Sequence, residues 1–271
     1  MMYKITRWIA LTFFSLLILI PSTMVLLGSF KSDLEIYDSP MALPVKWTLD
    51  NYQRLLDDGD ILINFKNSVI VTFFSVVITL LLASMVSFAI ARLMNVTGRV
   101  LFVLFALGLA IPGQVNIIPI YLLFSDLGLT NTFHGLIAVN IVATLPISVF
   151  ILTSFFRELP NEMYEVASID GASHLRVYRS IAVPLSRPAL GATAIFLFVI
   201  CWNDLLFPLL LITESAKNTL PLAMLDYRGE YATSFSMIFT AVMVASIPMV
   251  VMYLAMQKSF VAGLTAGAVK G

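Results

Sequence analysis

Six long apolar stretches constrain this chain more than any other feature of its sequence. Each has about the 20 residues that a helix needs to cross the hydrocarbon core of a bilayer. None contains Lys or Arg, and only the fifth contains a carboxylate. We expect six transmembrane helices, at Trp8 to Phe30, Val69 to Ile90, Val100 to Phe124, Leu136 to Phe156, Leu190 to Ile212 and Phe235 to Met256. The predicted fold is an all-α polytopic membrane protein, with residues 1–271 forming a single transmembrane domain.

The composition supports a membrane chain and excludes several other classes. Of the 271 residues 59% are hydrophobic and only 12% are charged, which excludes a soluble protein. The net charge is zero and no dense basic cluster indicates a nucleic-acid partner. The single cysteine, Cys201, lies in an apolar run, so we interpret it as a small apolar filler rather than part of a disulfide framework.

The distribution of basic residues predicts the orientation. With six spans, both termini lie on the same side of the membrane. The segments on that side carry ten Lys or Arg and the opposite segments carry six. By the positive-inside rule both termini are expected to be cytoplasmic, and so is the polar segment 157–189 between the fourth and fifth spans. The short loop from Arg92 to Arg99 adds to this bias, because it has two Arg and no acidic residue.

The polar segment 157–189 has the signals of two short helices joined by a turn. Pro160 suits a first helical turn, and a helix is expected from Pro160 to Ile169. Asp170 and Gly171 are residue types that accept a left-handed backbone, so the first helix should end there. Ser173 can cap a second helix, which Pro184 must end or kink.

The same segment resembles the cytoplasmic loop motif of binding-protein-dependent ABC importer permeases, written E-A-A, then D-G-A, then I-x-L-P. Val166 and Val183 depart from the usual Ala and Leu but stay small or apolar. In that family the loop forms a coupling helix that sits in a groove of an ATPase subunit. The alternative is an ordinary amphipathic loop at the membrane interface. By this resemblance the ATPase-coupling residues would be Glu165, Ala167, Ser168, Asp170, Gly171, Ala172, Tyr178 and Pro184.

Two further segments resemble carbohydrate permeases, and the second of them resembles the maltose and glycerol-phosphate type in particular. One is P-x-x-W-T-L-D-N-Y, beginning at Pro44, and the other is the ending G-L-T-A-G-A-V-K-G. The resemblance implies a carbohydrate importer in a bacterial inner membrane, with a second permease, two ATPase subunits and an extracytoplasmic solute-binding protein. ATP and Mg would bind the ATPase partners, because this chain has no G-x-x-x-x-G-K sequence followed by Ser or Thr.

Polar residues inside the spans are the candidates for the substrate pathway: Gln114, Asn116, Asn140, Trp202, Asn203 and Asp204. An uncompensated carboxylate at the bilayer centre costs about 3 kcal/mol, so Asp204 should face a cavity, the bundle interior or a hydrogen-bonding partner. Trp202 with Asn203 offers the stacking and hydrogen bonding that sugars need. The alternative is a structural role, in contacts between helices or with the partner permease.

Local signals also predict two segments outside the six spans. Asp50 can cap a short helix on the outer surface, over Leu49 to Leu56. The tail Gln257 to Gly271 contains three glycines and is expected not to form a stable helix. It either reaches toward the ATPase subunits or has no function.

No enzyme site or metal site is expected in this chain. His134 and His174 are far from each other and from Cys201 in the sequence, and no hydrolase motif is present. Two other classes stay open. An ion-coupled secondary transporter would need more ionisable residues in its spans than Asp204 alone, and an ABC permease for a solute other than a sugar would share the coupling loop.

Overall fold

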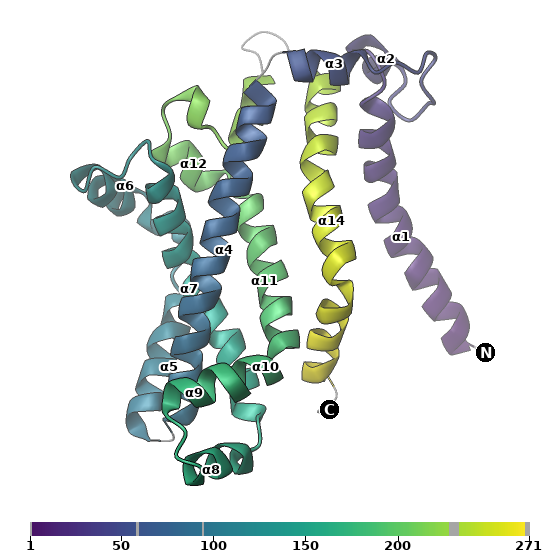
Figure 1. The fold of residues 1–271 in the computed structure, drawn as a ribbon. Helices are drawn as coiled ribbons and strands as arrows, with labels where there is room; N and C mark the ends of the chain where they lie inside the picture. The colour runs from purple at the N-terminus through teal and green to yellow at the C-terminus, as the bar shows by residue number, and fades with distance from the viewer. Residues whose placement is uncertain (1, 58–59, 94, 228–232, 269–271) are drawn as a thin grey trace. The chain divides into compact units, whose positions relative to one another are not determined.

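The computed structural model describes residues 2–57, 60–93, 95–227 and 233–268, and it is built from helices. Figure 1 shows these helices, which belong to two compact units. Unit 1 comprises Met1–Phe65 and Leu220–Pro248, and unit 2 comprises Lys66–Thr219 and Met249–Gly271. Two long helices, α4 (Asp60–Arg92) and α14 (Phe235–Ala268), contribute to both units.

Unit 1 is held together by polar contacts around the end of α1 (Met2–Gly28). The carboxylate of Asp33 accepts hydrogen bonds from the Ser236 backbone N–H at 2.8 Å and the Ser234 hydroxyl at 3.0 Å. Asp33 thereby joins the start of α2 to the start of α14. The remaining helices of this unit are α2 (Asp33–Asp38), α3 (Asp50–Asp57), α13 (Leu220–Ala223) and the 3-10 turn η4 (Met224–Tyr227).

The short helix expected over Leu49 to Leu56 is confirmed as α3, one residue further along. Asp50 is its first helical residue rather than its cap. The side chain of Leu55 is buried, and Asn51 donates hydrogen bonds to the carbonyls of Ser29 and Lys31. These contacts tie α3 to the chain that leaves α1.

Unit 2 contains the candidate sites. Its long helices are the rest of α4, α5 (Val96–Gly108), α7 (Phe133–Glu158) and α11 (Arg187–Trp202). Helix α7 packs against both α5 and α11. Shorter helices and turns connect them: η1 (Gly113–Asn116), α6 (Ile117–Asp126), α8 (Asn161–Ile169), α9 (His174–Val177), η2 (Tyr178–Ala182), α10 (Val183–Leu185), α12 (Leu206–Leu211) and η3 (Ser215–Lys217).

Four helices in the described chain are long and apolar enough to cross a membrane, and six when two bent helix pairs are each counted as one span. One of these pairs corrects the continuous third span expected over Val100 to Phe124. The chain bends by 81° between Val96–Gly108 and Gly113–Asp126. Pro112 is extended there, with ψ 130°, and the residue before a proline disfavours the helical region. The apolar run is therefore long enough but cannot be one straight helix.

The fifth span also differs from the continuous helix expected over Leu190 to Ile212. Helix α11 ends at Trp202, and α12 begins only at Leu206. Pro208 explains the break, because its ring would clash with the carbonyl of Asp204, four residues earlier, in a continuous helix. In addition, α11 begins before Leu190, at Arg187, after a bend of 77° from the helical segment His174–Leu185.

The prediction that the tail after Met256 does not form a stable helix was wrong for most of the tail. Helix α14 continues to Ala268. Each added residue of an existing helix gains a hydrogen bond without a new nucleation cost, and this offsets a glycine penalty of about 1 kcal/mol per residue. Residues 269–271 lie outside the described chain.

The turn η2 is a single π-helical turn between α9 and α10. The Val183 N–H donates to the carbonyl of Tyr178, five residues earlier, instead of four. Such a turn holds one residue more than a turn of α-helix. The second helix predicted in segment 157–189 is therefore present, but it consists of α9, η2 and α10, ending just after Pro184.

Candidate functional site

The segment from α8 to α10 contains, between α8 and α9, the turn that the sequence predicts. Gly171 has a left-handed backbone, with φ +72°, and the Ala172 N–H donates to the Ala167 carbonyl at 2.9 Å. Asp170 stays right-handed, so Gly171 alone supplies the reversal. Ser173 caps α9 by accepting a hydrogen bond from the Arg176 N–H, as predicted. Pro160 precedes α8 as its capping residue rather than lying in its first turn.

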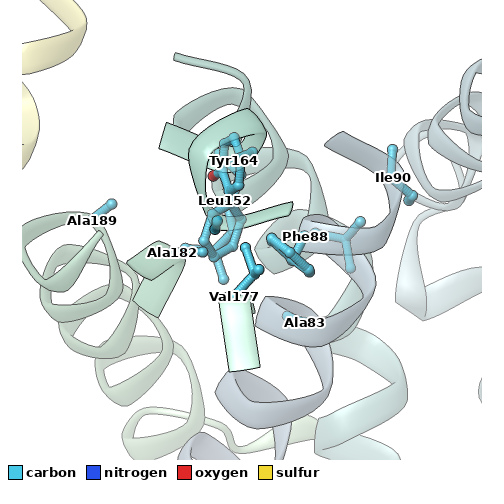
Figure 2. Close-up of a cluster of buried hydrophobic side chains, with 11 residues drawn as sticks. Ala83, Phe88, Ile90, Leu152, Tyr164, Val177, Ala182 and Ala189 are labelled. Atoms are coloured by element: carbon cyan, nitrogen blue, oxygen red, sulfur yellow. The ribbon is translucent and has the colours of Figure 1, made fainter. Parts of the chain in front are cut away.

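One face of α8 is anchored in a buried cluster that includes residues of α4, α7 and α9. Tyr164 is only 3% exposed, and its ring lies 6.2 Å from the ring of Phe88 in α4. Figure 2 shows Tyr164 and Phe88 in this cluster together with Leu152 of α7 and Val177 of α9. Ala167 is the second buried residue of α8. Burial of these side chains fixes α8 to the ends of two long helices.

The opposite face of α8 is open. Glu165 is exposed, and two apolar side chains beside it are exposed as well, Val166 at 58% and Ile169 at 85%. These two side chains, on a helix outside the long apolar stretches, are accessible for contact with a partner. Sequence reasoning did not select Val166 and Ile169 for this surface, although Val166 stood out as a departure from the family motif.

The predicted coupling residues therefore divide by exposure. Glu165, Ser168, Asp170 and Gly171 are exposed, Ala167 is buried, and Ala172, Tyr178 and Pro184 are half-buried. The Tyr178 hydroxyl lies 2.7 Å from the Ser84 hydroxyl of α4. Tyr178 thus connects the segment to α4, while the four exposed residues are accessible to another subunit.

Arg92, at the end of α4, makes a second connection to α8. Its guanidinium lies 4.1 Å from the centre of the Tyr164 ring and donates a hydrogen bond to the Asn161 side chain at 3.1 Å. Burial raises the pKa of the Tyr164 hydroxyl, and the charge of Arg92 opposes this shift. This contact was not predicted, because Arg92 and Tyr164 are 72 positions apart in the sequence.

The candidate residues of the fifth span lie at the break between α11 and α12. Trp202 is 2% exposed and stacks on Phe198, with ring centres 5.6 Å apart. Asp204 finds hydrogen-bonding partners: its Oδ1 accepts from the N–H groups of Leu206 at 3.1 Å and Phe207 at 3.3 Å. Its Oδ2 is buried without a partner among the described residues. Asp204 thus stabilises the start of α12 through Oδ1, and its Oδ2 stays buried.

The other candidates for the substrate pathway lie on different elements. Gln114 is exposed and Asn116 half-buried in η1, whereas Asn140 is buried in α7. Asn203 is exposed and donates a hydrogen bond to the Val199 carbonyl of its own helix. In the described chain, no hydrogen bond joins any of Gln114, Asn116, Asn140, Asn203 and Asp204 to another of them. The structure does place η1 near α12, since a Cβ on Gly113 would lie 3.9 Å from the Phe207 ring.

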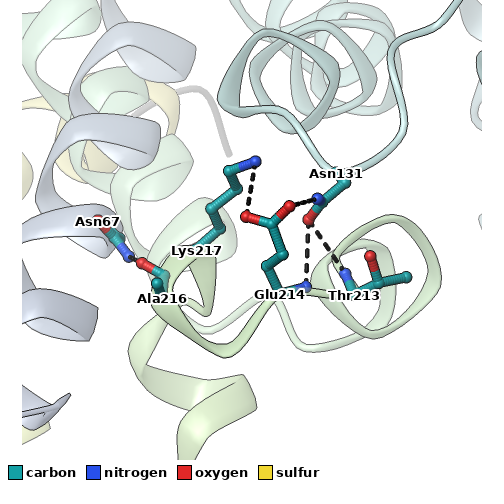
Figure 3. A network of polar contacts seen from close by, with 6 residues as sticks. All are labelled: Asn67, Asn131, Thr213, Glu214, Ala216 and Lys217. Atoms are coloured by element: carbon teal, nitrogen blue, oxygen red, sulfur yellow. Dashed lines mark hydrogen bonds and ion pairs between the residues drawn. The ribbon is translucent and has the colours of Figure 1, made fainter.

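A polar network lies at the other end of α7 (Figure 3). Asn131, with a left-handed φ of 56°, donates to the Glu214 carboxylate at 2.6 Å and accepts from the N–H groups of Thr213 and Glu214. Lys217 forms an ion pair with Glu214 at 2.9 Å. The contact with Lys217, and after it the hydrogen bond from Asn131, lowers the pKa of the Glu214 carboxyl. The network fixes the loop after α12, and no sequence motif predicted it.

Comparisons with known proteins agree on one family. The model of the family described as "Binding-protein-dependent transport system inner membrane component" matches residues 80–264. A multiple sugar-binding transport system permease protein of Streptococcus mutans is 36% identical, over 97% of this chain and 96% of its own length. A diacetylchitobiose uptake system permease protein of Streptomyces coelicolor is 34% identical, over 95% of this chain and 86% of its own length.

The fold also matches a solved structure. A chain in the crystal structure of a bacterial ABC transporter, involved in the import of the acidic polysaccharide alginate, superposes with a TM-score of 0.83. The match covers 96% of each chain at 22% sequence identity, so it supports the fold.

Proposed function

Because this chain belongs to the family of binding-protein-dependent transport system inner membrane components, we propose that it is one of two permease subunits of an ATP-driven carbohydrate importer. The names of the Streptococcus and Streptomyces relatives, both sugar uptake permeases, support a carbohydrate substrate. An importer of another solute is the alternative, and uptake assays with sugars and non-sugar solutes distinguish the two.

The proposed assembly contains this multi-pass chain, a second permease subunit, two ATPase subunits and an extracytoplasmic solute-binding protein. ATP and Mg bind the ATPase subunits, and this chain contributes no catalytic group. The assembly lies in a bacterial inner membrane with both termini of this chain in the cytoplasm. The excess of Lys and Arg in the segments on that side supports the orientation.

The observation that carries the proposal is the division of α8 into an anchored and an open face. Glu165, Val166 and Ile169 are exposed where a groove of an ATPase subunit would receive them. Tyr164 transfers a displacement of α8 to α4 through Phe88, and Arg92 adds a second link to the same helix. Closure of the ATPase pair would thus move the spans that form the translocation pathway.

For the substrate pathway we propose that Gln114 and Asn203, which are exposed, contact the sugar directly. Trp202 is buried against Phe198, and this supports a structural role for it. Asn116 and Asn140 have less accessible side chains and would shape the pathway. The unpartnered Oδ2 of Asp204 is buried, so this carboxylate, like Asn116 and Asn140, would shape the pathway.

The coupling role is tested with Glu165→Lys and Gly171→Asp. Each should abolish sugar uptake or binding of the ATPase subunits while the chain still inserts in the membrane. At Gly171 a side chain has open space around it, so the harm comes from the left-handed backbone and the added charge. Uptake of labelled sugar, copurification of the ATPase and the amount of membrane-inserted chain are measured together.

Two matched controls separate coupling from general damage. Asp126→Lys reverses an exposed charge at the end of α6 and should leave uptake unchanged. Gly171→Asn adds a neutral side chain that accepts a left-handed backbone, so it should retain more uptake than Gly171→Asp. Normal uptake in both Glu165→Lys and Gly171→Asp would contradict coupling through α8.

A further inference from the structure

A cavity of about 420 Å³ lies where the end of α4, the start of α5 and the end of α7 meet. In Figure 1 these helix ends lie at the α8 end of unit 2. Three arginines line the cavity, Arg92, Arg99 and Arg157, with the amide side chains of Asn95 and Asn161. No aspartate or glutamate is among its lining residues in the described chain. From this arrangement we propose a binding site for the phosphate headgroup of an anionic phospholipid.

The arginines of the cavity carry uncompensated charge. None of the three forms an ion pair with an acidic side chain within the described residues. Glu158 and Glu162 are sequence neighbours of Arg157 and Asn161, but neither lines the cavity. Three like charges in one cavity repel each other, and an anion bound among them removes this repulsion. A planar guanidinium is also the group best suited to paired hydrogen bonds with phosphate oxygens.

Aromatic rings hold two of the guanidinium groups in place before any ligand binds. Arg92 lies over Tyr164 at 4.1 Å, and Arg157 lies over Phe102 at 4.6 Å from the ring centre. A stacked guanidinium keeps its edge N–H groups free for a ligand and loses little conformational entropy on binding. Arg99 belongs to the first turn of α5, where the positive end of the helix dipole also favours an anion.

A second cavity beside the first favours a lipid over a free phosphate ion. Arg92 and Leu93 line both cavities, and the second one is otherwise bordered mainly by apolar side chains such as Met85, Phe88 and Leu175. A basic cavity next to an apolar one matches a molecule with a phosphate headgroup and acyl chains. Basic pockets at the cytoplasmic ends of membrane helices commonly bind such headgroups.

The test measures lipid binding to the assembled transporter, with this chain intact, by native mass spectrometry. The probes are dioleoyl phosphatidylglycerol, dioleoyl phosphatidylcholine and inorganic phosphate. We expect phosphatidylglycerol to be retained in preference to phosphatidylcholine. Arg99→Gln and Arg157→Gln should each weaken this binding about fivefold, and the double variant roughly 25-fold, from the usual contribution of one basic residue to anionic lipid binding.

Arg187→Gln is the matched control. It removes an exposed arginine from the first turn of α11, and Arg187 lines neither cavity. An equal loss with Arg187→Gln would overturn the site, because it would show a general effect of charge. Equal retention of both lipids would overturn it as well. Arg157→Lys keeps the positive charge but loses the planar guanidinium. Its binding of phosphatidylglycerol is expected to lie between that of the original chain and that of Arg157→Gln.

Two other outcomes would assign the cavity to a different ligand. Retention of inorganic phosphate without phosphatidylglycerol would overturn the lipid assignment in favour of a soluble anion. Lipid binding to the permease pair that vanishes when the ATPase subunits assemble would overturn it in favour of an acidic side chain of the ATPase. None of these readouts depends on sugar transport, so the site and the proposed function can fail separately.

Discussion

The two ends of helix α7 are attached to their surroundings in different ways. At the Glu158 end, α8 is held by the buried Tyr164 ring, which contacts Phe88 and lies under Arg92, and Arg157 of α7 lies over Phe102 of α5. At the Phe133 end, about 39 Å away for 26 helical residues, the loop after α12 is held by hydrogen bonds of exposed side chains. Apolar burial is strong but non-directional, whereas hydrogen bonds require a defined geometry. The first end therefore supplies stability and the second end fixes the position of a loop.

The largest effect that tests this comparison is expected from Tyr164→Ala. Removing a buried aromatic side chain should cost about 3 kcal/mol of unfolding free energy and should release α8. Thermal unfolding of the purified chain in detergent measures the loss. Ile169→Ala is the control on the same helix, because Ile169 is 85% exposed and its truncation should change the melting temperature little. Equal effects of the two variants would contradict the anchoring role of Tyr164.

Tyr164→Phe sharpens the same test. The Tyr164 hydroxyl is buried without a hydrogen-bond partner among the described residues, so it contributes no bond that Phe would lose. Phe keeps the ring that contacts Phe88 and Arg92. We expect the stability of this variant to be equal to that of the original chain or higher. A clear loss of stability would mean that the hydroxyl, not the ring, anchors α8.

A smaller effect is expected from Asn131→Ala at the other end. The variant loses the bond to Glu214 and places a residue with a Cβ, but without the amide, in a left-handed backbone, at a cost of about 1–2 kcal/mol. Hydrogen exchange of residues 211–218 should rise sharply, while exchange in α8 stays unchanged. Asn131→Gly separates the two causes, since it relieves the backbone but does not restore the bonds. Faster exchange in α8 would refute the independence of the two ends.

The smallest effect is a pH dependence of the same loop. Lys217 and Asn131 hold the pKa of Glu214 below its ordinary value of 4.5. The stabilisation of the loop by the ionised Glu214 is therefore complete above pH 4.5. This stabilisation is lost as the pH falls through the lowered pKa. A spin label on Ser215→Cys should become more mobile as the pH falls below 4.5 and through the lowered pKa of Glu214, and the added variant Glu214→Gln should remove this dependence. An α8 label should show no parallel change.

The sequence predicted best what depends on neighbouring residues. The turn at Gly171, the cap at Ser173 and the helix α3 follow from local backbone chemistry, and each is present. The apolar runs were also located, because hydropathy depends on composition alone. Hydropathy does not say whether an apolar run is straight, so the sequence did not decide whether Pro112 and Pro208 break their spans. The prolines were visible, but whether one is tolerated depends on surrounding helices.

The contacts of the candidate sites were beyond the sequence for a different reason. Arg92 over Tyr164, and Asn131 on Glu214, join residues far apart in the chain. Their partners follow only from how α4, α7 and α12 pack. Similarly, polarity alone could not separate the buried Asn140 from the exposed Gln114 as candidates for the substrate pathway. The roles of the coupling and pathway residues stay predictions until the variants are measured.

The π-helical turn at Tyr178–Ala182 sets the direction in which the chain leaves α10 toward α11. Deleting one residue there would allow ordinary α-helical bonding but would rotate the downstream chain by about 100°, the angle of one residue in a helix. Because the chain bends by 77° before α11, this rotation would swing α11 to a new direction and take Trp202 out of its buried position. The one additional residue of this turn therefore determines where the fifth span is placed.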